Sequence, residues 1–566
     1  MSSSSLAKVR VAHVAGPTAT IQNTPPLVTS NKARAKYGLA PRRNPDGSLP
    51  KFDALRLQRL AAPVKVYVDQ FSAHALEADA AELYGPPDGY IDTNGTFCTH
   101  RKAESDKPVY EIELRPEDGL YALPYMARQA DGSAWEEEGT MPLGIKHRQG
   151  FYPDGSRSFE EIDRTQIGVD GVVNEISAQA DVDFFRSLPP GGFTKGVPRD
   201  RRADVGDGDI APESAGSHFF AYKPFHLMTT PARPALAKAA NDMQAVVSSG
   251  KYDGAIWTQG SPQMEECAYW FNLLVDTTLP ICCNSAQRPQ GQTSADGPKN
   301  LIDSVAYIRS KVWADAEGKN RAGVVAVQEQ QFFAAREVYK SDARPGNYRA
   351  TGGHGGIVGQ VSHMGRMTLT YVPVFKHTYL SEVNITRLPA STQAVVKGVD
   401  GLRLVDVVIK KDGKLLGDAI PSVGIVKDGG FGAEEFGDGA DEEVELKAAL
   451  EHKLALGRLS GFVVEGLVPY GMLSTPGKEA MMQRAVFSGL PVVRVPRGSS
   501  EGFADPSPFF IAGANLTSIK ARLLLMAAMM KIGSLPPAKD PLNPTEAERA
   551  ATQRAVALYQ EIFWTH

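Results

Sequence analysis

Cysteine is scarce in this chain, and long apolar runs are missing. Four cysteines occur in 566 residues, and none forms a C-x-x-C pair. This excludes a disulfide-built scaffold and a cysteine zinc site, and it predicts a reduced, cytoplasmic protein. No apolar run has the length of a membrane span, and the N-terminus M-S-S-S-S-L-A-K-V-R lacks the order of a secretory signal. A net charge of −4 and a pI near 6.3 give no electrostatic case for nucleic acid. We therefore expect no nucleic-acid or membrane partner.

Several catalytic signatures are also missing. The eleven histidines show no H-E-x-x-H or H-x-H spacing, so we expect no metal site and no cofactor. The G-G-H-G-G around His354 is not followed by the Lys-Ser/Thr of a phosphate loop, which favours a turn. No G-x-S-x-G elbow occurs, which argues against an ordinary esterase.

The most informative stretch runs from residue 251 to residue 300. An apolar strand, Ala255 to Thr258, leads into a tight turn at Gly260-Ser261-Pro262, and a helix and a second strand, Leu279 to Cys283, follow. Strand, helix and strand in this order predict a parallel sheet. Neighbouring Cys282 and Cys283 should then point to opposite faces of the second strand. Ser261 lies at the carboxyl end of a strand, where doubly wound sheets bind their ligands.

The rest of the chain predicts an α/β protein with two domains. The first is a larger N-terminal domain over residues 1–380, a mostly parallel sheet flanked by helices, with Val9 to Ala15 as its first strand. A smaller α/β domain follows over residues 421–566, with Leu516 to Lys531 as its closing helix. We expect a linker or insertion at residues 381–420 and a large insertion at about 76–222, which is rich in Gly, Pro, Asp and Arg. Further strands are predicted at 64–71, 89–93, 110–114 and 323–328, and helices at 233–249, 301–312, 442–456 and 478–488.

Three motifs carry a resemblance to a known family. The strings Q-G-S-P-Q-M-E-E-C-A-Y, A-Q-R-P and S-A-D-G-P-K-N-L resemble the core of the bacterial-type L-asparaginase/glutaminase family. That family has H-G-T-D-T-M-E-E-T-A-Y, a Met-Arg-Pro run and S-A-D-G-P-x-N-L in the same order. V-V-E-G, P-V-V-R and A-N-L-T-S-I-K-A-R-L-L-L-M match its C-terminal part. The resemblance covers about residues 251–358 and 421–531, so the chain looks like an enlarged, divergent member.

The resemblance implies threonine nucleophiles that form acyl-enzyme intermediates from amides. The first of the two family threonines corresponds to Thr18, in A-G-P-T after the first strand. Pro17 replaces a glycine there and removes a backbone N–H. Thr20 and Thr96 are competing candidates for the first nucleophile, because each also follows a predicted strand.

The second family threonine corresponds to Ser261, and its lysine partner corresponds to Lys340. The resemblance implies that the amine takes a proton from the hydroxyl, which is a poor nucleophile without a nearby base. The family aspartate that holds the α-ammonium group of the substrate is replaced by Pro262. Proline offers no charge and no side-chain hydrogen bond.

The predicted substrate-binding residues are Thr229, Thr230, Gln259 and Gln263. The two threonines align with the family's carboxylate-binding G-S-Q-D, with Phe71 to His74 as an alternative alignment, and Gln259 replaces the family histidine. With the amino-acid contacts replaced, we predict an amidohydrolase for a linear or cyclic carboxamide other than free asparagine or glutamine. Alternatives are an asparaginase/glutaminase proper, a non-catalytic ligand-binding member, and an assembly subunit. Family relatives imply a homo-oligomer, a dimer or homotetramer, with active sites at the subunit boundary.

Overall fold

The computed structural model describes the chain almost continuously from residue 233, and in shorter segments before it. The described residues are 9–15, 47, 58–59, 64–68, 87, 89–91, 97–114, 120–121, 126–128, 151–153, 180–186, 219–221, 233–261, 263–288, 296–341, 348–350, 356–429, 443–468, 471–497 and 506–566. Everything below concerns these residues.

The larger sheet has eight strands in the order β10-β1-β12-β13-β14-β15-β18-β19. The first five run parallel, and each of the last three is antiparallel to the strand before it. β1 therefore lies inside the sheet, which suits its apolar sequence. The strands are β1 (Val9–Ala15), β10 (Ala180–Arg186), β12 (Gly254–Thr258), β13 (Ile281–Asn284), β14 (Val325–Gln328), β15 (Gln331–Ala334), β18 (Ile357–Val361) and β19 (Met367–Leu369).

Helices cover both faces of this sheet. α4 (Pro234–Val247) and α5 (Gln263–Leu274) pack on one face, and α6 (Gly297–Ser310) packs on the other. Cys283 lies in the core on the α4 and α5 face, and Cys282 lies in the core on the α6 face. The predicted opposite orientation of these two side chains is therefore confirmed. All four cysteines are free and buried.

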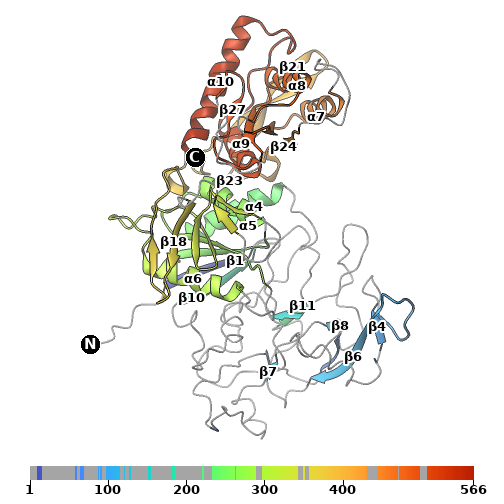
Figure 1. Cartoon of the computed structure of the whole chain (residues 1–566), viewed down its shortest axis with the longest axis vertical. Coiled ribbons are helices and arrows are strands. Elements are labelled where there is room, and N and C mark those ends of the chain that lie inside the picture. The colour runs from blue at the N-terminus through green and yellow to red at the C-terminus, as the bar shows by residue number, and fades with distance from the viewer. Residues whose placement is uncertain are drawn as a thin grey trace.

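The smaller sheet has four parallel strands in the order β24-β25-β26-β27. Figure 1 shows it above the larger sheet, in orange to red. Its strands are β24 (Ser422–Lys427), β25 (Ser460–Gly466), β26 (Val492–Pro496) and β27 (Ile511–Ala512). Its helices are α7 (Val444–Ala455), α8 (Pro476–Phe487), α9 (Ser518–Ile532) and α10 (Glu546–Thr565).

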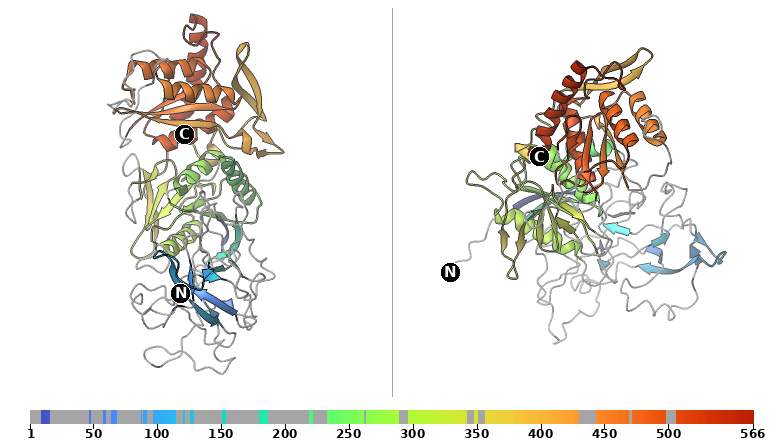
Figure 2. Two further views of the ribbon diagram at one scale, coloured as in Figure 1. Left: turned by 90° about the vertical axis from the view of Figure 1, so that its right-hand side faces the viewer. Right: turned by 45° about the horizontal axis from the view of Figure 1, so that its top comes forward.

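The two sheets share a core where α5 meets α9. Trp270 and Leu273 of α5 lie in the same apolar cluster as Leu524 and Met529 of α9. Both views of Figure 2 place the C-terminal end of the chain at this junction. The core runs across the junction, and the division into two domains stays a prediction.

Smaller elements complete the described fold. A five-stranded sheet has the order β5-β4-β6-β3-β8, and five two-stranded sheets consist of β2-β7, β9-β11, β16-β17, β20-β21 and β22-β23. Two 3-10 turns, η7 (Thr378–Leu380) and η8 (Gly417–Ala419), connect larger elements. The bounds are β2 (Gln58–Arg59), β3 (Val64–Val68), β4 (Gly89–Ile91), β5 (Phe97–Cys98), β6 (Lys107–Leu114), β7 (Leu120–Tyr121), β8 (Met126–Arg128), β9 (Phe151–Pro153), β11 (Phe219–Ala221), β16 (Val338–Lys340), β17 (Tyr348–Ala350), β20 (Ser391–Gly398), β21 (Gly401–Val408), β22 (Lys410–Lys411) and β23 (Lys414–Leu415).

Three regions differ from expectation. β10 lies within the predicted insertion, yet it is an edge strand of the larger sheet. Residues 381–420 contain two hairpins, and Ala394 and Val395 of β20 lie in the core of the smaller sheet, so this stretch is more than a connection. The helix predicted to close the chain, α9, is followed by α10, which begins with a capping box at Thr545 and Glu548. No helix in the described part of the chain is both long and apolar enough to cross a membrane.

Candidate active site

Ser261 lies between the end of β12 and the start of α5. The turn is held on the sheet because Gln259 donates its backbone N–H to the carbonyl of Asn284, at 3.0 Å. The backbone N–H of Met264 then bonds to the carbonyl of Gly260, which starts the first turn of α5. Ser261 is half-buried, at the carboxyl edge of the parallel strands, as predicted.

Two side chains donate hydrogen bonds to the hydroxyl oxygen of Ser261. The Gln287 amide donates from Nε2 at 3.1 Å, and the Tyr348 hydroxyl donates at 2.8 Å. Gln287 follows β13, and Tyr348 begins β17, so two separate segments converge on one oxygen. Tyr348 also bonds to the hydroxyl of Ser285, at 3.1 Å. Burial raises the pKa of Tyr348, which keeps its phenol protonated as a donor.

Lys340 reaches Ser261 through Gln287. The ammonium group of Lys340, at the end of β16, donates a hydrogen bond to Oε1 of Gln287, whose Nε2 donates to Ser261. The backbone N–H of Lys340 donates to the carboxyl group of Glu265 in α5. The two residues predicted as a pair are thus brought into one network, with an amide between them.

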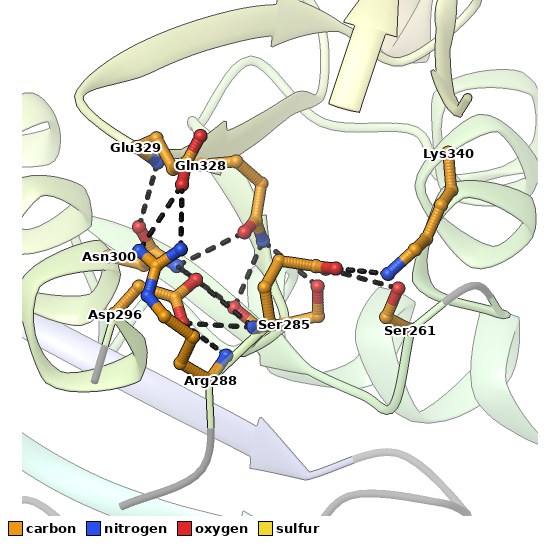
Figure 3. Close-up of polar contacts among 9 residues, drawn as sticks. Ser261, Ser285, Arg288, Asp296, Asn300, Gln328, Glu329 and Lys340 are labelled. Carbon is orange, nitrogen blue, oxygen red and sulfur yellow. Dashed lines mark hydrogen bonds and ion pairs between the residues drawn. The ribbon is translucent and has the colours of Figure 1, made fainter. Parts of the chain in front are cut away.

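A buried polar network holds Gln287 in place. The Asp296 carboxylate accepts the backbone N–H groups of Gln287, at 2.9 Å, and of Arg288, at 2.7 Å. Asn300 donates to the carbonyl of Ser285, at 2.9 Å, and to Gln328, at 3.1 Å. Asp296 and Asn300 of the S-A-D-G-P-K-N motif therefore fix residues 285–288, directly after β13 (Figure 3).

The same network extends to the turn after β14. Arg288 forms an ion pair with Glu329, at 3.2 Å, and the backbone N–H of Glu329 bonds to Asn300, at 3.0 Å. Glu329 and Gln330 both have positive φ angles, 49° and 66°, which matches a tight hairpin turn into β15. The loops after β13 and β14 are thereby joined beside Ser261.

The buried Lys520 contacts the backbone of Glu265, near the start of α5. Lys520 of α9 is 1% exposed, and its ammonium donates to the carbonyls of Glu265 and Ala335, each at 2.6 Å. Burial raises the pKa of Glu265, although Lys520 opposes this shift. Burial lowers the pKa of Lys520, and Glu265 opposes that shift in turn. α9, which belongs to the smaller sheet, thus contacts Glu265, the residue that accepts the backbone N–H of Lys340.

The remaining predicted site residues divide into two groups. Gln259 is 3% exposed, and its Oε1 accepts the indole N–H of Trp257 at 2.8 Å, so the side chain faces the interior. Gln263 is half-buried at the first position of α5. Outside the described residues lie Thr18, Thr20, Thr96, Thr229, Thr230 and Pro262. The described residues contain no group of three or more potential metal ligands.

The sequence prediction missed Gln287, Tyr348 and Ser285. A signal for Gln287 was present, because it stands where the family has the methionine of its Met-Arg-Pro run. An amide in that place can accept and donate at once, whereas a thioether cannot. Tyr348 gave no such signal, since its contact with Ser261 depends on how β17 folds back along β16.

Comparison with known proteins now bears on this site. A family model described as "Asparaginase, N-terminal" matches residues 228–350, which include β12, α5, β13, β14, β16 and β17. The chain thus carries a segment that matches the asparaginase family model, and over about half its length it is similar to bacterial asparaginases and glutaminase-asparaginases. It is 29% identical to "Glutaminase-asparaginase" of Acinetobacter glutaminasificans over 303 residues, 52% of this chain and 75% of that protein. It is 27% identical to "L-asparaginase 2" of Bacillus subtilis over 303 residues, 52% of this chain and 66% of the relative.

A solved structure, "Probable Cytoplasmic L-asparaginase from Campylobacter jejuni", has a TM-score of 0.44 and 22% identity over 69% of this chain and 91% of the other. The matched family is one of amide hydrolases, and the network around Ser261 lies inside the matched residues.

Proposed function

We propose that this protein hydrolyses a carboxamide at the carboxyl edge of β12. In this proposal Ser261 and Lys340 form the hydroxyl and amine unit, and Thr18 is the first nucleophile. The observation that carries it is the convergence of Gln287 and Tyr348 on the Ser261 oxygen, with Lys340 next to Gln287. Two donors on one oxygen stabilise negative charge that develops there, as a reacting hydroxyl requires.

The proposed substrate class is an amide that lacks a free amino-acid head group. Pro262 stands where the relatives' motif has an aspartate, and it offers no partner for an α-ammonium group. Truncating one partner of a buried charge pair costs about 2–5 kcal/mol of binding. Free asparagine or glutamine would incur that cost, whereas a neutral linear or cyclic amide would not.

A panel of amides tests both parts of the proposal. Ammonia or amine release is measured from asparagine, glutamine, aryl and alkyl amides, lactams and cyclic imides. Ser261→Ala and Thr18→Ala are compared with wild type. Ser391→Ala in β20 and Thr370→Ala just after β19, both at exposed positions, serve as matched controls. Turnover of a neutral amide that is lost in the two site variants and kept in the controls is the expected result. Unchanged turnover in Ser261→Ala contradicts the proposed site.

The second candidate is an asparaginase/glutaminase proper. The names of its relatives favour it, since they include "Glutaminase-asparaginase" and "L-asparaginase 2". Efficient release of ammonia from asparagine or glutamine in the same panel would establish this alternative. No turnover of any amide would favour the ligand-binding alternative. Cytoplasmic location and a homotetramer stay predictions, and the mass of the chain in solution tests the second.

A further inference from the structure

Gln287 occupies the position between the amine and the hydroxyl of the proposed reaction. Its Oε1 accepts from Lys340, and its Nε2 donates to Ser261 at 3.1 Å. An amide has an acceptor at one end and a donor at the other, so the two bonds have a direction. The direction here runs from the amine, through the amide, to the hydroxyl oxygen.

The charge of Lys340 determines this direction. A lysine ammonium carries three donors and no acceptor, so it bonds only to the oxygen end of the amide. The nitrogen end then faces Ser261, whose oxygen accepts. A neutral amine has a lone pair, so it can accept a hydrogen bond from the nitrogen end of the amide. This requires a half-turn of the Gln287 amide, after which the amide oxygen faces Ser261 and accepts a hydrogen bond from its hydroxyl.

The loop around Gln287 permits a turn of the side-chain amide alone. The Asp296 carboxylate holds the backbone N–H groups of Gln287 and Arg288, at 2.9 and 2.7 Å. The backbone is therefore fixed while the half-buried side-chain amide faces two partners. Tyr348 keeps a second donor on the Ser261 oxygen, at 2.8 Å, in either orientation.

We propose that Gln287 is a positioning residue whose amide orients the Ser261 hydroxyl according to the charge of Lys340. This inference rests on the proposed function, because it assigns Ser261 and Lys340 to the same reaction. With Lys340 charged, the Ser261 oxygen accepts from the amide. With Lys340 neutral, the Ser261 hydroxyl donates to it. Gln287 transmits the direction of a hydrogen bond and transfers no proton itself.

Two variants at position 287 separate this role from a structural one. Gln287→Met keeps the length of the side chain, restores the family residue and removes both bonds. Gln287→Glu keeps an acceptor for Lys340 but, when ionised, has no donor for Ser261. Gln393→Met, at an exposed position of β20, is the matched control. The kcat, the KM and the pH profile of kcat are measured on the best amide from the panel.

We expect Gln287→Met to lower kcat by about 10-fold or more, with KM changed by less than about twofold, because the loss lies in orientation and not in binding. We expect Gln287→Glu to move the acid limb of the kcat profile to higher pH by about one unit, because a carboxylate favours the charged amine. A residue with a structural role alone would lower kcat and leave the limb in place.

A second measurement works without turnover. Lysines are acetylated with trace acetic anhydride at pH 8, and the label on Lys340 is compared with that on exposed Lys414 by mass spectrometry. Only a neutral amine reacts, so Gln287→Glu should slow labelling of Lys340 by about tenfold relative to wild type. Gln393→Met should match wild type.

The outcomes are distinguishable. Wild type that hydrolyses no amide refutes the proposed function, while the labelling ratio still decides whether Gln287 is coupled to the charge of Lys340. Equal labelling of Lys340 in wild type and Gln287→Glu, or an unmoved acid limb in an active Gln287→Glu, overturns the inference. A moved limb together with slowed labelling supports it.

Discussion

Removal of the buried Lys520 amine should destabilise the protein strongly. Lys520 is 1% exposed, and it donates to the carbonyls of Glu265 and Ala335 at 2.6 Å, beside the Glu265 side chain. Lys520→Met keeps the apolar stem but leaves two buried carbonyls without this donor and Glu265 without its counter-charge. A buried carbonyl left without its donor costs about 1–3 kcal/mol. We expect a loss of that size in the free energy of unfolding.

Urea unfolding followed by tryptophan fluorescence measures this loss, since Trp257 and Trp270 are buried in the cores on either side of α5. Lys411→Met, at an exposed hairpin position, is the matched control and should stay within about 0.5 kcal/mol of wild type. A loss below about 1 kcal/mol in Lys520→Met would refute the reasoning.

A double-mutant cycle with Glu265→Gln tests the pairing itself. Glutamine at position 265 carries no charge, so it needs no ammonium nearby, and its oxygen still accepts from the Lys340 backbone N–H. The double variant should therefore be more stable than the sum of the single changes, by at least about 1 kcal/mol. Additive losses would show that Lys520 acts through its carbonyl contacts alone.

Three further predictions concern catalysis, acid and the last helix. Ser261→Ala should lower kcat by about 100-fold or more, while Ser391→Ala should not, in the amide-release assay. Burial lowers the pKa of His377 to about 4 from 6.5, so the unfolded chain binds the proton first. The neutral His377 therefore contributes stability, about 3 kcal/mol in full, that is complete above pH 6.5 and is lost as the pH falls toward 4. In His377→Gln the urea midpoint should depend less steeply on pH over this range. Thr545→Ala removes the capping box of α10 and should cost about 1 kcal/mol in urea unfolding, whereas Thr370→Ala should cost nothing measurable.

Much of the fold follows from local sequence pattern. Val9–Ala15 is a strand at its predicted bounds, the strand before Ser261 begins one residue earlier than predicted, and the predicted helix follows it. These segments were predictable because apolar runs of a strand's length, ended by Gly and Pro, leave few other ways to bury their side chains. The place of Ser261 at the carboxyl edge followed from the same unit.

The parts that were not predicted depend on long-range packing. β10 has no local feature that distinguishes it from its surroundings, and it becomes a sheet strand only by pairing with β1. The bridge from Lys340 through Gln287 to Ser261 joins residues 53 and 26 positions apart, so no window of sequence contains it. The side-chain contacts of a site are set by how its loops fold back, and spacing along the chain does not encode that path.

The placement of β1 affects how the protein is made. His13 of β1 bonds to Thr258 at the end of β12, 245 residues later, at 2.7 Å. During synthesis at about 5–20 residues per second, β1 therefore waits on the order of 10–50 s before β12 has been made. In that interval V-R-V-A-H-V-A lacks β12, its partner on that side, and its apolar side chains are open to other chains. The strand that leads to Thr18 is thus also a segment exposed to misassembly, and slower initiation or a bound chaperone should raise the yield of folded protein.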